Sequence, residues 1–430
     1  MATITWIAGS AGNWNSGINW SGGVVPGVSD DVVFDGTGLG NCTLDVNVSV
    51  LSIAINSAYT GTLDAVTFNL TTSGNFIDSA GLILFGTGTW TIGGNLTLRG
   101  TSNTDCQSAT VNLTGNFFSQ VPGWIPGTST WTVGGNVNSY NGSPNNTYKN
   151  WSLTQTGTGN TAQFTNYANY TIQSGASITN AREMNCRFAT INGTYDLNGR
   201  NLRPQYGLTI GSTGVFGSGT GTGGIYFGGL TNYFADVIIN LQGTLNLGTW
   251  FFRFDLRNGK STYRLQTAAG LELPRFEFGS GSTAGGDNWK LQIENDTIFA
   301  QDFLFYSDGS GSPGSLNNST YNPNITFKGN ATFRIAVGMN YNVGTGTIIF
   351  DGSSAKSADF NGETVEAIVV SDASTGNITL ADNVTTPYVH DCNNLIDLNG
   401  FTITETGTDP SPCVSVYAGY YLLDEPFKRL

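Results

Sequence analysis

Residues 86–98 read GTGTWTIGGNLTL, and residues 127–139 read GTSTWTVGGNVNS. Apolar and polar residues alternate in both stretches, as a half-buried β-strand requires. A third stretch, ATVNLTGNFF (109–118), repeats the pattern midway between them. We expect the Gly-Asn step in each to supply a corner with positive φ. The pattern therefore predicts short strands joined by tight corners.

The Gly-Asn step recurs at positions 74, 94, 115, 135 and 159, a spacing of about 20 residues. A repeat of that length is typical of one coil of a β-solenoid, with about three short strands per turn. We therefore predict an all-β fold, a right-handed parallel β-helix with coils of about 20 residues and capped ends. Stacked β-sandwich or jelly-roll domains are the alternative, because they also combine short strands with frequent turns.

Composition supports a β fold and excludes several classes of protein. Gly (59) and Asn (45) together make up about a quarter of the 430 residues, whereas there are only 8 Glu and 6 Lys. Helices are rich in the latter kind of residue and poor in Gly. A chain that is 39% apolar is not disordered. A net charge of −13 without a basic run argues against nucleic-acid binding, and no apolar run is long enough to span a membrane.

The chain divides into five predicted segments. Residues 1–40 form a Trp-rich N-terminal cap, residues 41–249 and 309–408 form solenoid coils, and residues 409–430 form an aromatic tail. Residues 250–308, of which 14 are charged, are predicted to be an insertion or an interface. The tail is expected either to cap the coils or to dock on a partner. Its partner-contacting residues would be Tyr420, Tyr421 and Phe427.

Five cysteines carry no C-x-x-C motif, namely Cys42, Cys106, Cys186, Cys392 and Cys413. Their odd number and wide spacing predict buried free thiols made in a reducing compartment rather than a disulfide framework or a zinc site. Asp30, Asp31 and Asp35 could offer oxygens to Ca²⁺, but their spacing matches no complete loop motif. We interpret them as turn-forming residues and predict no metal site and no cofactor.

His390 is the only histidine, and it lies beside Asp391 and Cys392. Such neighbours invite comparison with Cys-His or His-Asp catalytic groups. A strand over 386–392 would place His390 and Cys392 on one face and Asp391 on the other. Catalytic triads are usually formed by residues distant in sequence, so we interpret this site as a polar strand end.

Carboxylates are the other route to chemistry, because β-helical lyases and glycosidases act through Asp and Glu pairs. The possible catalytic residues of 250–308 are Glu272, Glu277, Asp287, Glu294, Asp296 and Asp302. Exposed aromatic residues nearby, such as Trp250, Phe278 and Trp289, could stack on sugar rings. The favoured interpretation is a solvated surface with ion pairs to Arg253, Arg257, Arg264, Arg275 and Lys290. We therefore assign no catalytic residue, and regard Trp250 and Trp289 as possible glycan or partner contacts.

The opening segment, 1–60, carries a resemblance to a known group of proteins. Trp6, Trp14 and Trp20 precede DDVVFDG (30–36) and CTLDVNVSVLSIAI (42–55). This opening, followed by Gly-Thr repeats, resembles the head and coils of bacterial and phage β-helical surface proteins, which include adhesin-like repeat proteins and virion spikes. The resemblance implies a fold and an exterior setting rather than an activity.

Together these features predict a non-enzymatic structural protein of a bacteriophage virion: a capsid decoration, a head fibre, or a tail spike or fibre. No secretory signal is visible at the N-terminus, and a virion protein leaves the host by lysis. We expect capsid or tail proteins as partners, host surface polysaccharide as a further contact, and a homo-oligomer or many copies per particle. The alternatives are a tailspike depolymerase that uses the carboxylates of 250–308, and a secreted or surface adhesin of a bacterium.

Overall fold

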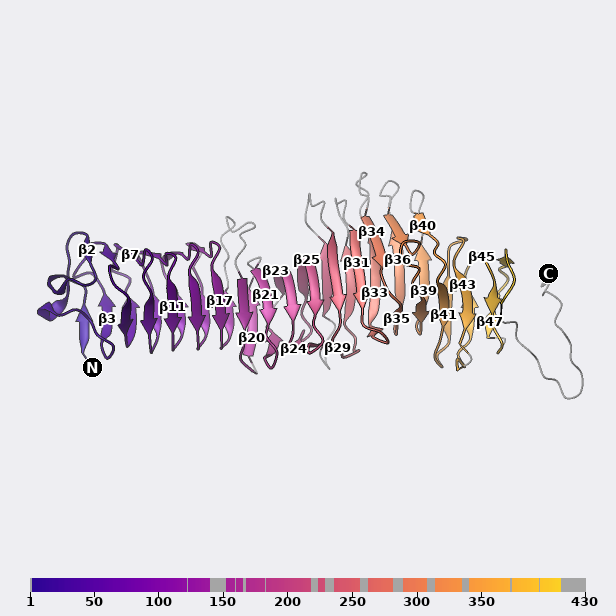
Figure 1. The fold of residues 1–430 in the computed structure, drawn as a ribbon, viewed down its shortest axis with the longest axis horizontal. Helices are drawn as coiled ribbons and strands as arrows, with labels where there is room; N and C mark the ends of the chain where they lie inside the picture. Colours follow the sequence, from indigo (N-terminus) through magenta and orange to yellow (C-terminus); the bar gives the residue numbers. More distant parts are fainter. Residues whose placement is uncertain are drawn as a thin grey trace, which may run out of the picture. The chain divides into compact units, whose positions relative to one another are not determined.

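A computed structural model describes residues 2–121, 123–139, 152–158, 160–164, 168–181, 183–217, 223–228, 236–255, 262–280, 289–307, 314–334, 340–371, 373–393 and 395–410. Among them the only helical segments are two short 3-10 helices, η1 (Gly17–Asn19) and η2 (Ser21–Gly23). The protein is therefore all-β, as predicted. It divides into two compact units, an N-terminal unit (1–221) and a C-terminal unit (222–430). Figure 1 labels many of their strands along the ribbon.

Strands of the N-terminal unit form three parallel ladders. The first contains β1 (Thr3–Thr5), β3 (Asp31–Phe34), β6 (Ser52–Ile55), β9 (Phe76–Asp78), β12 (Leu96–Leu98), β15 (Phe117–Ser119), β18 (Val137–Ser139), β20 (Asn160–Phe164), β22 (Ser177–Asn180), β24 (Thr194–Asp196) and β26 (Val215–Phe216). The second contains β2 (Gly12–Asn13), β4 (Cys42–Thr43), β7 (Thr62–Asp64), β10 (Leu82–Leu84), β13 (Asn103–Asp105) and β16 (Gly123–Ile125). The third contains β5 (Val48–Val50), β8 (Leu70–Thr72), β11 (Thr89–Ile92), β14 (Thr110–Leu113), β17 (Thr130–Val133), β19 (Ser152–Gln155), β21 (Ala168–Ile172), β23 (Met184–Ile191) and β25 (Leu202–Ile210).

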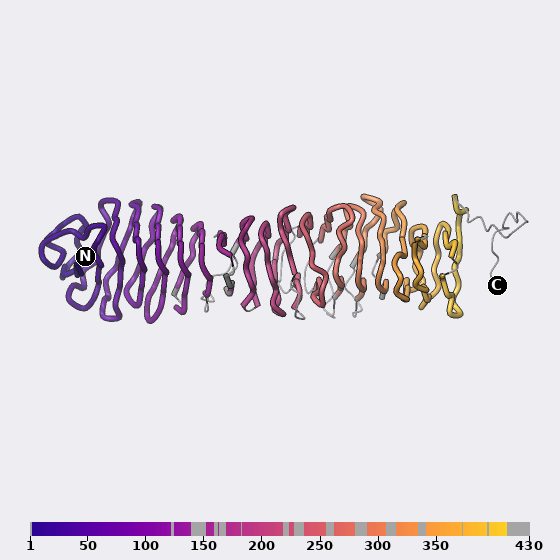
Figure 2. Tube along the Cα trace, turned by 90° about the horizontal axis from the view of Figure 1, so that it is seen from below, coloured from indigo at the N-terminus to yellow at the C-terminus, as the bar shows by residue number. Residues whose placement is uncertain are grey.

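The register of these ladders confirms the predicted spacing. Along β8, β11, β14, β17 and β19 the residues that pair in succession are Leu70, Trp90, Val111, Trp131 and Leu153, so each step is close to the Gly-Asn spacing of about 20 residues. All five are fully buried, so the strand period of two places them on the inner face. Successive turns of the chain lie side by side in Figure 2. Long parallel sheets of this kind are consistent with a β-solenoid-like fold.

The glycines of the Gly-Asn repeat have a different role from the one predicted. Positive φ occurs instead at Val66, Gly86, Gln107 and Gly127, which recur at one corner of successive coils. At Gly94 the reason for glycine is space, because an added Cβ would lie 2.6 Å from a backbone carbon of the preceding coil. The predicted positive-φ corner is therefore wrong for the Gly-Asn step, where close backbone approach requires glycine.

The asparagines of the Gly-Asn repeat form a ladder of hydrogen bonds along the corner where this repeat lies. Asn75 Oδ1 accepts the backbone N–H of Asn95 at 2.8 Å, and Asn95 Oδ1 accepts that of Asn116 at 2.8 Å. Asn116 Oδ1 in turn accepts the N–H of Asn136 at 2.8 Å. Each side chain thus pairs a corner N–H that the strand ladders leave unpaired.

Three tryptophans of the predicted cap pack together at the start of the N-terminal unit. Trp6, Trp14 and Trp20 are at most 1% exposed. Trp20 makes edge-to-face contacts with both of the others, with ring centroids 4.9 Å and 4.7 Å away. The rings also contact Phe34 of β3, and Trp6 and Trp20 form an isolated antiparallel bridge beside β1. This aromatic cluster covers apolar surface at the beginning of the ladders.

Strands of the C-terminal unit form parallel ladders as well. One contains β27 (Gly224–Gly228), β30 (Phe251–Asp255), β33 (Arg275–Ser280), β36 (Phe303–Ser307), β39 (Ala331–Arg334), β42 (Lys356–Asp359), β44 (Ile378–Leu380) and β47 (Ile396–Asp397). The next contains β28 (Val237–Leu241), β31 (Thr262–Thr267), β34 (Trp289–Ile293), β37 (Gly314–Asn317) and β40 (Asn340–Asn342). A third contains β32 (Glu272–Leu273), β35 (Thr297–Phe299), β38 (Ile325–Phe327), β41 (Thr347–Phe350), β43 (Ala367–Val370) and β46 (Val389–His390). The unit also contains β29 (Thr244–Leu245) and the pair β45 (Val384–Thr386) and β48 (Ile403–Glu405).

Coils of the C-terminal unit are longer than predicted. The residues that pair in succession are Phe252, Phe276, Phe303, Ala331 and Ala358, and each step exceeds the Gly-Asn interval. The predicted coil length is therefore wrong for this part of the unit, because each coil carries additional residues between its strands. The described strands of 250–308, from β30 to β36, pair in register with those of later coils, so they belong to the stack.

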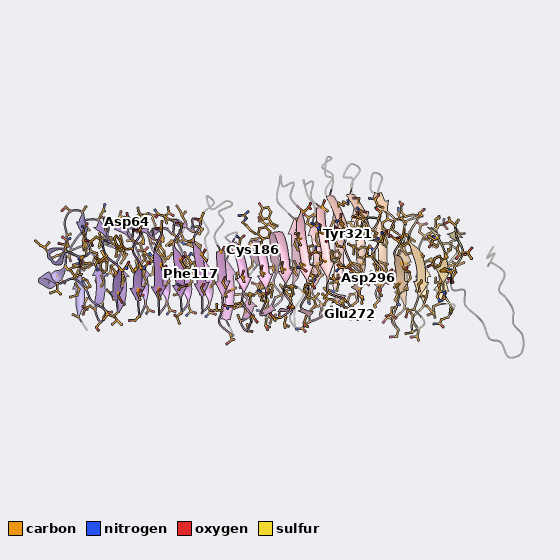
Figure 3. All side chains as sticks on the ribbon, viewed as in Figure 1. Asp64, Phe117, Cys186, Glu272, Asp296 and Tyr321 are labelled. Atoms are coloured by element: carbon orange, nitrogen blue, oxygen red, sulfur yellow. The ribbon has the colours of Figure 1, made fainter. Side chains whose placement is uncertain are left out.

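Cysteine chemistry differs between the two units. Cys42, Cys106 and Cys186 of the N-terminal unit are buried free thiols, as predicted; Figure 3 labels Cys186 in β23. Burial raises the pKa of Cys106 and Cys186 above the usual range. Cys392 instead takes part in a disulfide bond. The prediction of a free thiol is wrong for Cys392, which lies on an exposed corner, while Cys413 lies outside the described residues.

Candidate functional site

Glu277 is the most deeply buried of the predicted carboxylates that the structure describes. It lies in β33 between Phe276 and Phe278, and its side chain is 4% exposed. The parallel register sets Arg253 of β30 directly beside it, with Arg253 Nε 2.8 Å from Glu277 Oε2. Arg275 Nη2 contacts the other oxygen. Two guanidinium groups share this buried carboxylate, as the ion-pair interpretation of the segment predicts.

Glu294 is held in a similar way. Arg264 Nε contacts one of its oxygens, while Gln266 Nε2 donates to the other at 2.6 Å and Gln292 Nε2 donates at 3.0 Å. Burial raises the pKa of Glu294, but the hydrogen bonds from Arg264 and the two glutamines outweigh it and lower the pKa below its usual value. A general acid needs the opposite shift. This carboxylate is therefore arranged as a fixed anion.

Glu272 and Asp296 take part in contacts between coils; Figure 3 labels both. Lys328 Nζ donates to Glu272 Oε1 at 2.6 Å, and this hydrogen bond raises the pKa of Lys328. Asp296 Oδ1 accepts the backbone N–H of Asn324 at 2.8 Å. Both side chains are bonded to a residue of a later coil, so they brace the stack.

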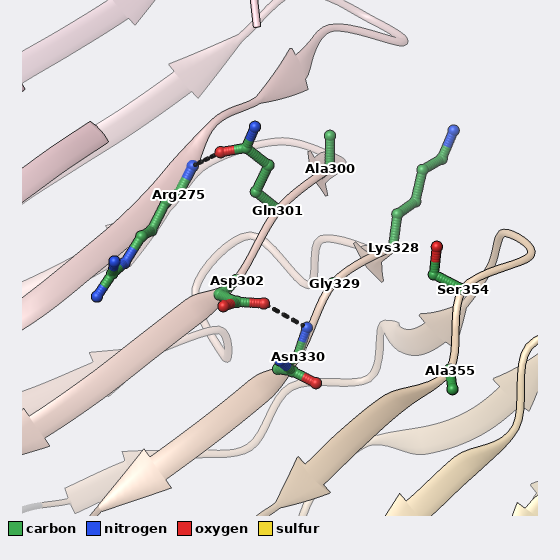
Figure 4. Close-up of a pocket in the computed structure, with 9 residues that line it drawn as sticks. All are labelled: Arg275, Ala300, Gln301, Asp302, Lys328, Gly329, Asn330, Ser354 and Ala355. Carbon is green, nitrogen blue, oxygen red and sulfur yellow. Dashed lines mark hydrogen bonds between the residues drawn. The ribbon is translucent and has the colours of Figure 1, made fainter. Parts of the chain in front are cut away.

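A polar pocket opens beside these residues, at a corner of four successive coils (Figure 4). Its volume is about 380 Å³. It is lined by Arg275, Ala300, Gln301, Asp302, Lys328, Gly329, Asn330, Ser354 and Ala355. Gln301 Oε1 accepts the N–H of Arg275 at 3.0 Å, and Asp302 Oδ1 accepts the N–H of Asn330 at 3.0 Å. These two hydrogen bonds hold neighbouring coils together at the pocket wall. The lining contains positive charge from Arg275 and Lys328 and negative charge from Asp302.

The aromatic residues predicted to stack on sugars lie elsewhere. Trp250 is 1% exposed, and its Nε1 donates to Asn246 O at 2.7 Å; Phe278 is fully buried. The prediction of exposed rings is wrong for these two, because both face the inner side of their coils. Asp287, Tyr420, Tyr421 and Phe427 lie outside the described residues, as does the side chain of Trp289.

His390 stands in a second cluster, near the end of the described chain. Its Nε2 lies 3.2 Å from Cys392 Sγ, and its Nδ1 lies 2.8 Å from Asp409 Oδ2. Asp391 turns away and accepts the N–H groups of Leu395 and Ile396 at 3.0 and 2.9 Å. His390 and Cys392 therefore lie on one side and Asp391 on the other, as predicted, although the strand is shorter than the predicted 386–392: β46 ends at His390 and Cys392 lies in a turn. The carboxylate beside the ring is Asp409, which sequence inspection missed although it follows His390 at a separation close to one coil.

The aspartates considered for Ca²⁺ bind the protein's own chain. Asp30 accepts the N–H groups of Ala2 and Gly27 at 3.1 and 3.0 Å, and these bonds lower its pKa. Asp35 accepts the N–H of Thr37 at 2.8 Å. This is the turn-forming role that we favoured. Within the described ranges, no three His, Cys, Asp or Glu side chains come together as a metal site would require.

Two buried acidic residues escaped the sequence analysis. Asp78 is fully buried in β9, and burial raises its pKa to about 7 although Ser102 and Thr104 donate to its carboxylate. Glu366 is 1% exposed and accepts the N–H of Gly344 at 2.8 Å. The alternation Phe76, Ile77, Asp78 was the available signal, because it places Asp78 on the inner face.

No protein-family model, no curated protein and no solved structure matches this chain. In the part of the chain that the structure describes, no helix is long and apolar enough to cross a membrane.

Proposed function

We propose that this protein is a structural component of a bacteriophage virion, built as a right-handed parallel β-helix. It would serve as a capsid decoration, a head fibre, or a tail spike or fibre. It would act as a structural support: its stacked coils would be held on the particle, with their side faces exposed to the surroundings. Capsid or tail proteins of the same particle are its proposed partners, and it is proposed to occur as a homo-oligomer or in many copies.

The observation that carries this proposal is the continuous stacking of each unit. Buried rungs such as Trp90, Val111 and Trp131 continue from coil to coil, and the Asn75-to-Asn136 ladder pairs corner N–H groups outside the strands. Repeats that bind only their neighbours make extended, stiff supports. The resemblance of the opening segment to β-helical surface proteins supports the exterior setting.

The pocket beside Arg275 supports contact with host surface polysaccharide. It combines hydrogen-bonding groups with both signs of charge, and about 380 Å³ is within the size range of small-molecule sites. Carboxylates of the same unit take part in contacts between coils: Glu277 and Glu294 are ion-paired, and Asp296 binds the N–H of Asn324. That arrangement favours binding over cleavage, so the depolymerase is the second candidate.

The decisive experiment is composition analysis of purified particles. Peptide mass spectrometry should find the chain at a fixed copy number per capsid protein, and immunogold labelling should place it on the head or tail. Its absence from particles whose genome encodes it would overturn the proposal and favour a bacterial adhesin. Incubation with host polysaccharide should give no shortened glycans; release of oligosaccharides that is lost in Glu277→Gln would identify a depolymerase instead. An experimental density map would test the handedness.

A further inference from the structure

Three neighbouring strands of the N-terminal unit share a growing irregularity in their register. At this level of the ladder β21 has no extra residue, β23 has one, Arg187, and β25 has two, Gln205 and Tyr206. A regular parallel ladder needs none of these three residues. Bulges of this kind redirect side chains, and they are frequent beside functional sites. The irregularity begins next to Cys186 of β23, which Figure 3 labels.

Arg187, Phe188 and Tyr206 form an aromatic platform at this bulge. The guanidinium carbon of Arg187 lies 5.1 Å from the centroid of the Tyr206 ring, which is a cation–π contact. The ring centroids of Phe188 and Tyr206 are 5.7 Å apart, with an angle of 33° between the planes. Phe188 is 43% exposed, and it is the only exposed phenylalanine in the part of the chain that the structure describes. The platform therefore offers an apolar ring face with a cation beside it.

Polar groups around the platform have no partner within the described residues. Arg187 Nε, Gln205 Oε1 and Asn169 Oδ1 are buried atoms that make no hydrogen bond there. Unlike Arg203, which pairs with Glu183, Arg187 has no carboxylate partner among the residues described. Buried polar groups in native proteins are normally paired. The bulge thus holds hydrogen-bonding groups that a ligand, or bound water in its place, would complete.

We propose that the aromatic platform binds an acidic polysaccharide, with a sugar ring packed on Phe188 and a glycan carboxylate paired with Arg187. This inference rests on the proposed contact with host polysaccharide, and it adds a second binding place and a chemical class of glycan. The apolar face of a sugar packs on an aromatic ring, while the amides of Gln205 and Asn169 rotate to bond its hydroxyl groups.

Charge selects the acidic class of glycan. A guanidinium group without a protein partner forms charge-assisted, bidentate hydrogen bonds with a carboxylate. The chain has a net charge of −13, so much of its surface repels an acidic polymer. Binding is then confined to the place where Arg187 meets the polymer, because attraction there is combined with repulsion elsewhere.

The test applies the full chain to an array of bacterial polysaccharides, in which repeats containing uronic or sialic acid stand beside neutral repeats. We expect retention on acidic members, and the acidic glycan bound most tightly then serves as the probe in biolayer interferometry at pH 7. Phe188→Ala and Arg187→Gln should each weaken its binding about 10-fold. Neither side chain is buried, so both variants should keep the far-UV circular dichroism spectrum of the parent.

Two matched variants remove the same chemical groups elsewhere. Tyr321→Ala removes a ring that is 45% exposed in the C-terminal unit, and Arg203→Gln removes a guanidinium group that already pairs with Glu183. Both should keep the affinity of the parent. Raising the salt concentration from about 0.05 M to about 0.5 M should weaken binding by the parent more than binding by Arg187→Gln.

Retention of neutral repeats alone, or of no repeat, would overturn this inference. So would equal affinities for the parent, Phe188→Ala and Arg187→Gln. Loss of binding in Lys328→Gln but not in Phe188→Ala would also overturn it, and would place the glycan in the pocket beside Arg275. The virion role is judged separately: a chain found in purified particles that binds no acidic glycan keeps that role and loses this inference, whereas a chain absent from particles that binds through Phe188 does the reverse.

Discussion

The two units stack their strands in the same parallel way but fill their interiors differently. In the shorter coils of the N-terminal unit, tryptophans alternate with aliphatic residues, as in Trp90, Val111 and Trp131. In the longer coils of the C-terminal unit, phenylalanines follow one another: Phe254, Phe278 and Phe305 stand on consecutive rungs. The number of residues per coil can therefore change while the paired, inward-facing side chains of neighbouring strands stay in register.

Corners of the two units use the same kind of hydrogen bond, in which a side-chain oxygen accepts a backbone N–H of the next coil; asparagines do this in both units, and aspartates join them in the C-terminal unit. Asn75 to Asn136 pair the corner N–H groups of the N-terminal unit. In the C-terminal unit, Asp296 and Asp302 accept the same kind of N–H, and Arg–Glu pairs such as Arg253–Glu277 are added across neighbouring strands. A side-chain oxygen at the corner is therefore the shared requirement, and Arg–Glu pairs between coils are not particular to the longer coils, since Arg203 pairs with Glu183 in the N-terminal unit.

Removing a ring from the phenylalanine stack should give the largest effect. Phe276→Ala should lower the free energy of unfolding of the C-terminal unit by about 3–5 kcal/mol, because it leaves a cavity among buried side chains. Phe276 contacts the rings of Phe252, Phe254, Phe299 and Phe303. Denaturant titration followed by far-UV circular dichroism measures the loss.

The matched variant is Phe117→Ala in the N-terminal unit, whose ring contacts Trp124 and Trp131. We expect it to cost about 3 kcal/mol, at the lower end of the range. A larger loss for Phe117→Ala than for Phe276→Ala would break the idea that the longer coils depend more on continuous ring stacking.

Close approach of the coils gives the next effect. In Gly94→Ala the new Cβ would lie 2.4 Å from Asn75 Oδ1 and 2.6 Å from the backbone of the preceding coil. Both must shift, so we expect a loss of about 3 kcal/mol, measured by tryptophan fluorescence during unfolding. Gly9→Ala is the control, because an added Cβ there meets nothing within 4 Å. If Gly94→Ala and Gly9→Ala lose the same free energy of unfolding, the loss does not come from contact between coils but from an effect of the substitution on the unfolded chain.

Much of the fold followed from the sequence because two periods were visible in it. The alternation around Trp90 and Trp131 predicted strands, and the Gly-Asn spacing predicted the offset between paired rungs. Longer coils escaped because their Gly-Asn signal is weak and their extra residues lie between strands. Trp250 was misplaced because local composition does not reveal which side of a coil a residue faces.

The candidate sites were predicted less well, because they join residues of different coils. Asp409 meets His390 from the neighbouring coil, and Asp78 meets Ser102 in the same way. Both separations in sequence are close to one coil, so a search for polar residues one coil apart would have found these pairs. The partners of Glu277 were harder to predict, since Arg253 lies on the preceding strand of the ladder but Arg275 is on the same strand.

A buried carboxylate makes the N-terminal unit sensitive to pH. Burial raises the pKa of Asp78 to about 7, above its unfolded value of 3.8. The folded state therefore holds a proton that the unfolded state releases, so the contribution of Asp78 to stability should be most favourable below about pH 4 and should be lost as the pH rises through about 7. Asp78→Asn removes this dependence and should stabilise the unit by about 2 kcal/mol at pH 8.

Urea titrations at pH 5 and pH 8 test this directly. The parent protein should lose stability between the two, and Asp78→Asn should not. Asp64→Asn is the control, because Asp64 lies at a corner and binds the N–H of Val66. If the stability of the parent protein is unchanged between pH 5 and pH 8, the raised pKa of the buried Asp78 carboxyl group is contradicted.

The smallest effect concerns the corner of the N-terminal unit where φ is positive. Val66 has φ 53°, whereas the equivalent corner residues one and three coils later are Gly86 and Gly127. A β-branched side chain in this region is strained by about 1–2 kcal/mol, and Val66 is 41% exposed, so its truncation removes little buried surface. Val66→Gly should therefore stabilise the unit by about 1 kcal/mol, measured as a rise in the unfolding midpoint. Val24→Gly, exposed at φ −123°, should instead destabilise it slightly. A loss of stability in Val66→Gly would mean that the side chain, and not the backbone, determines this corner.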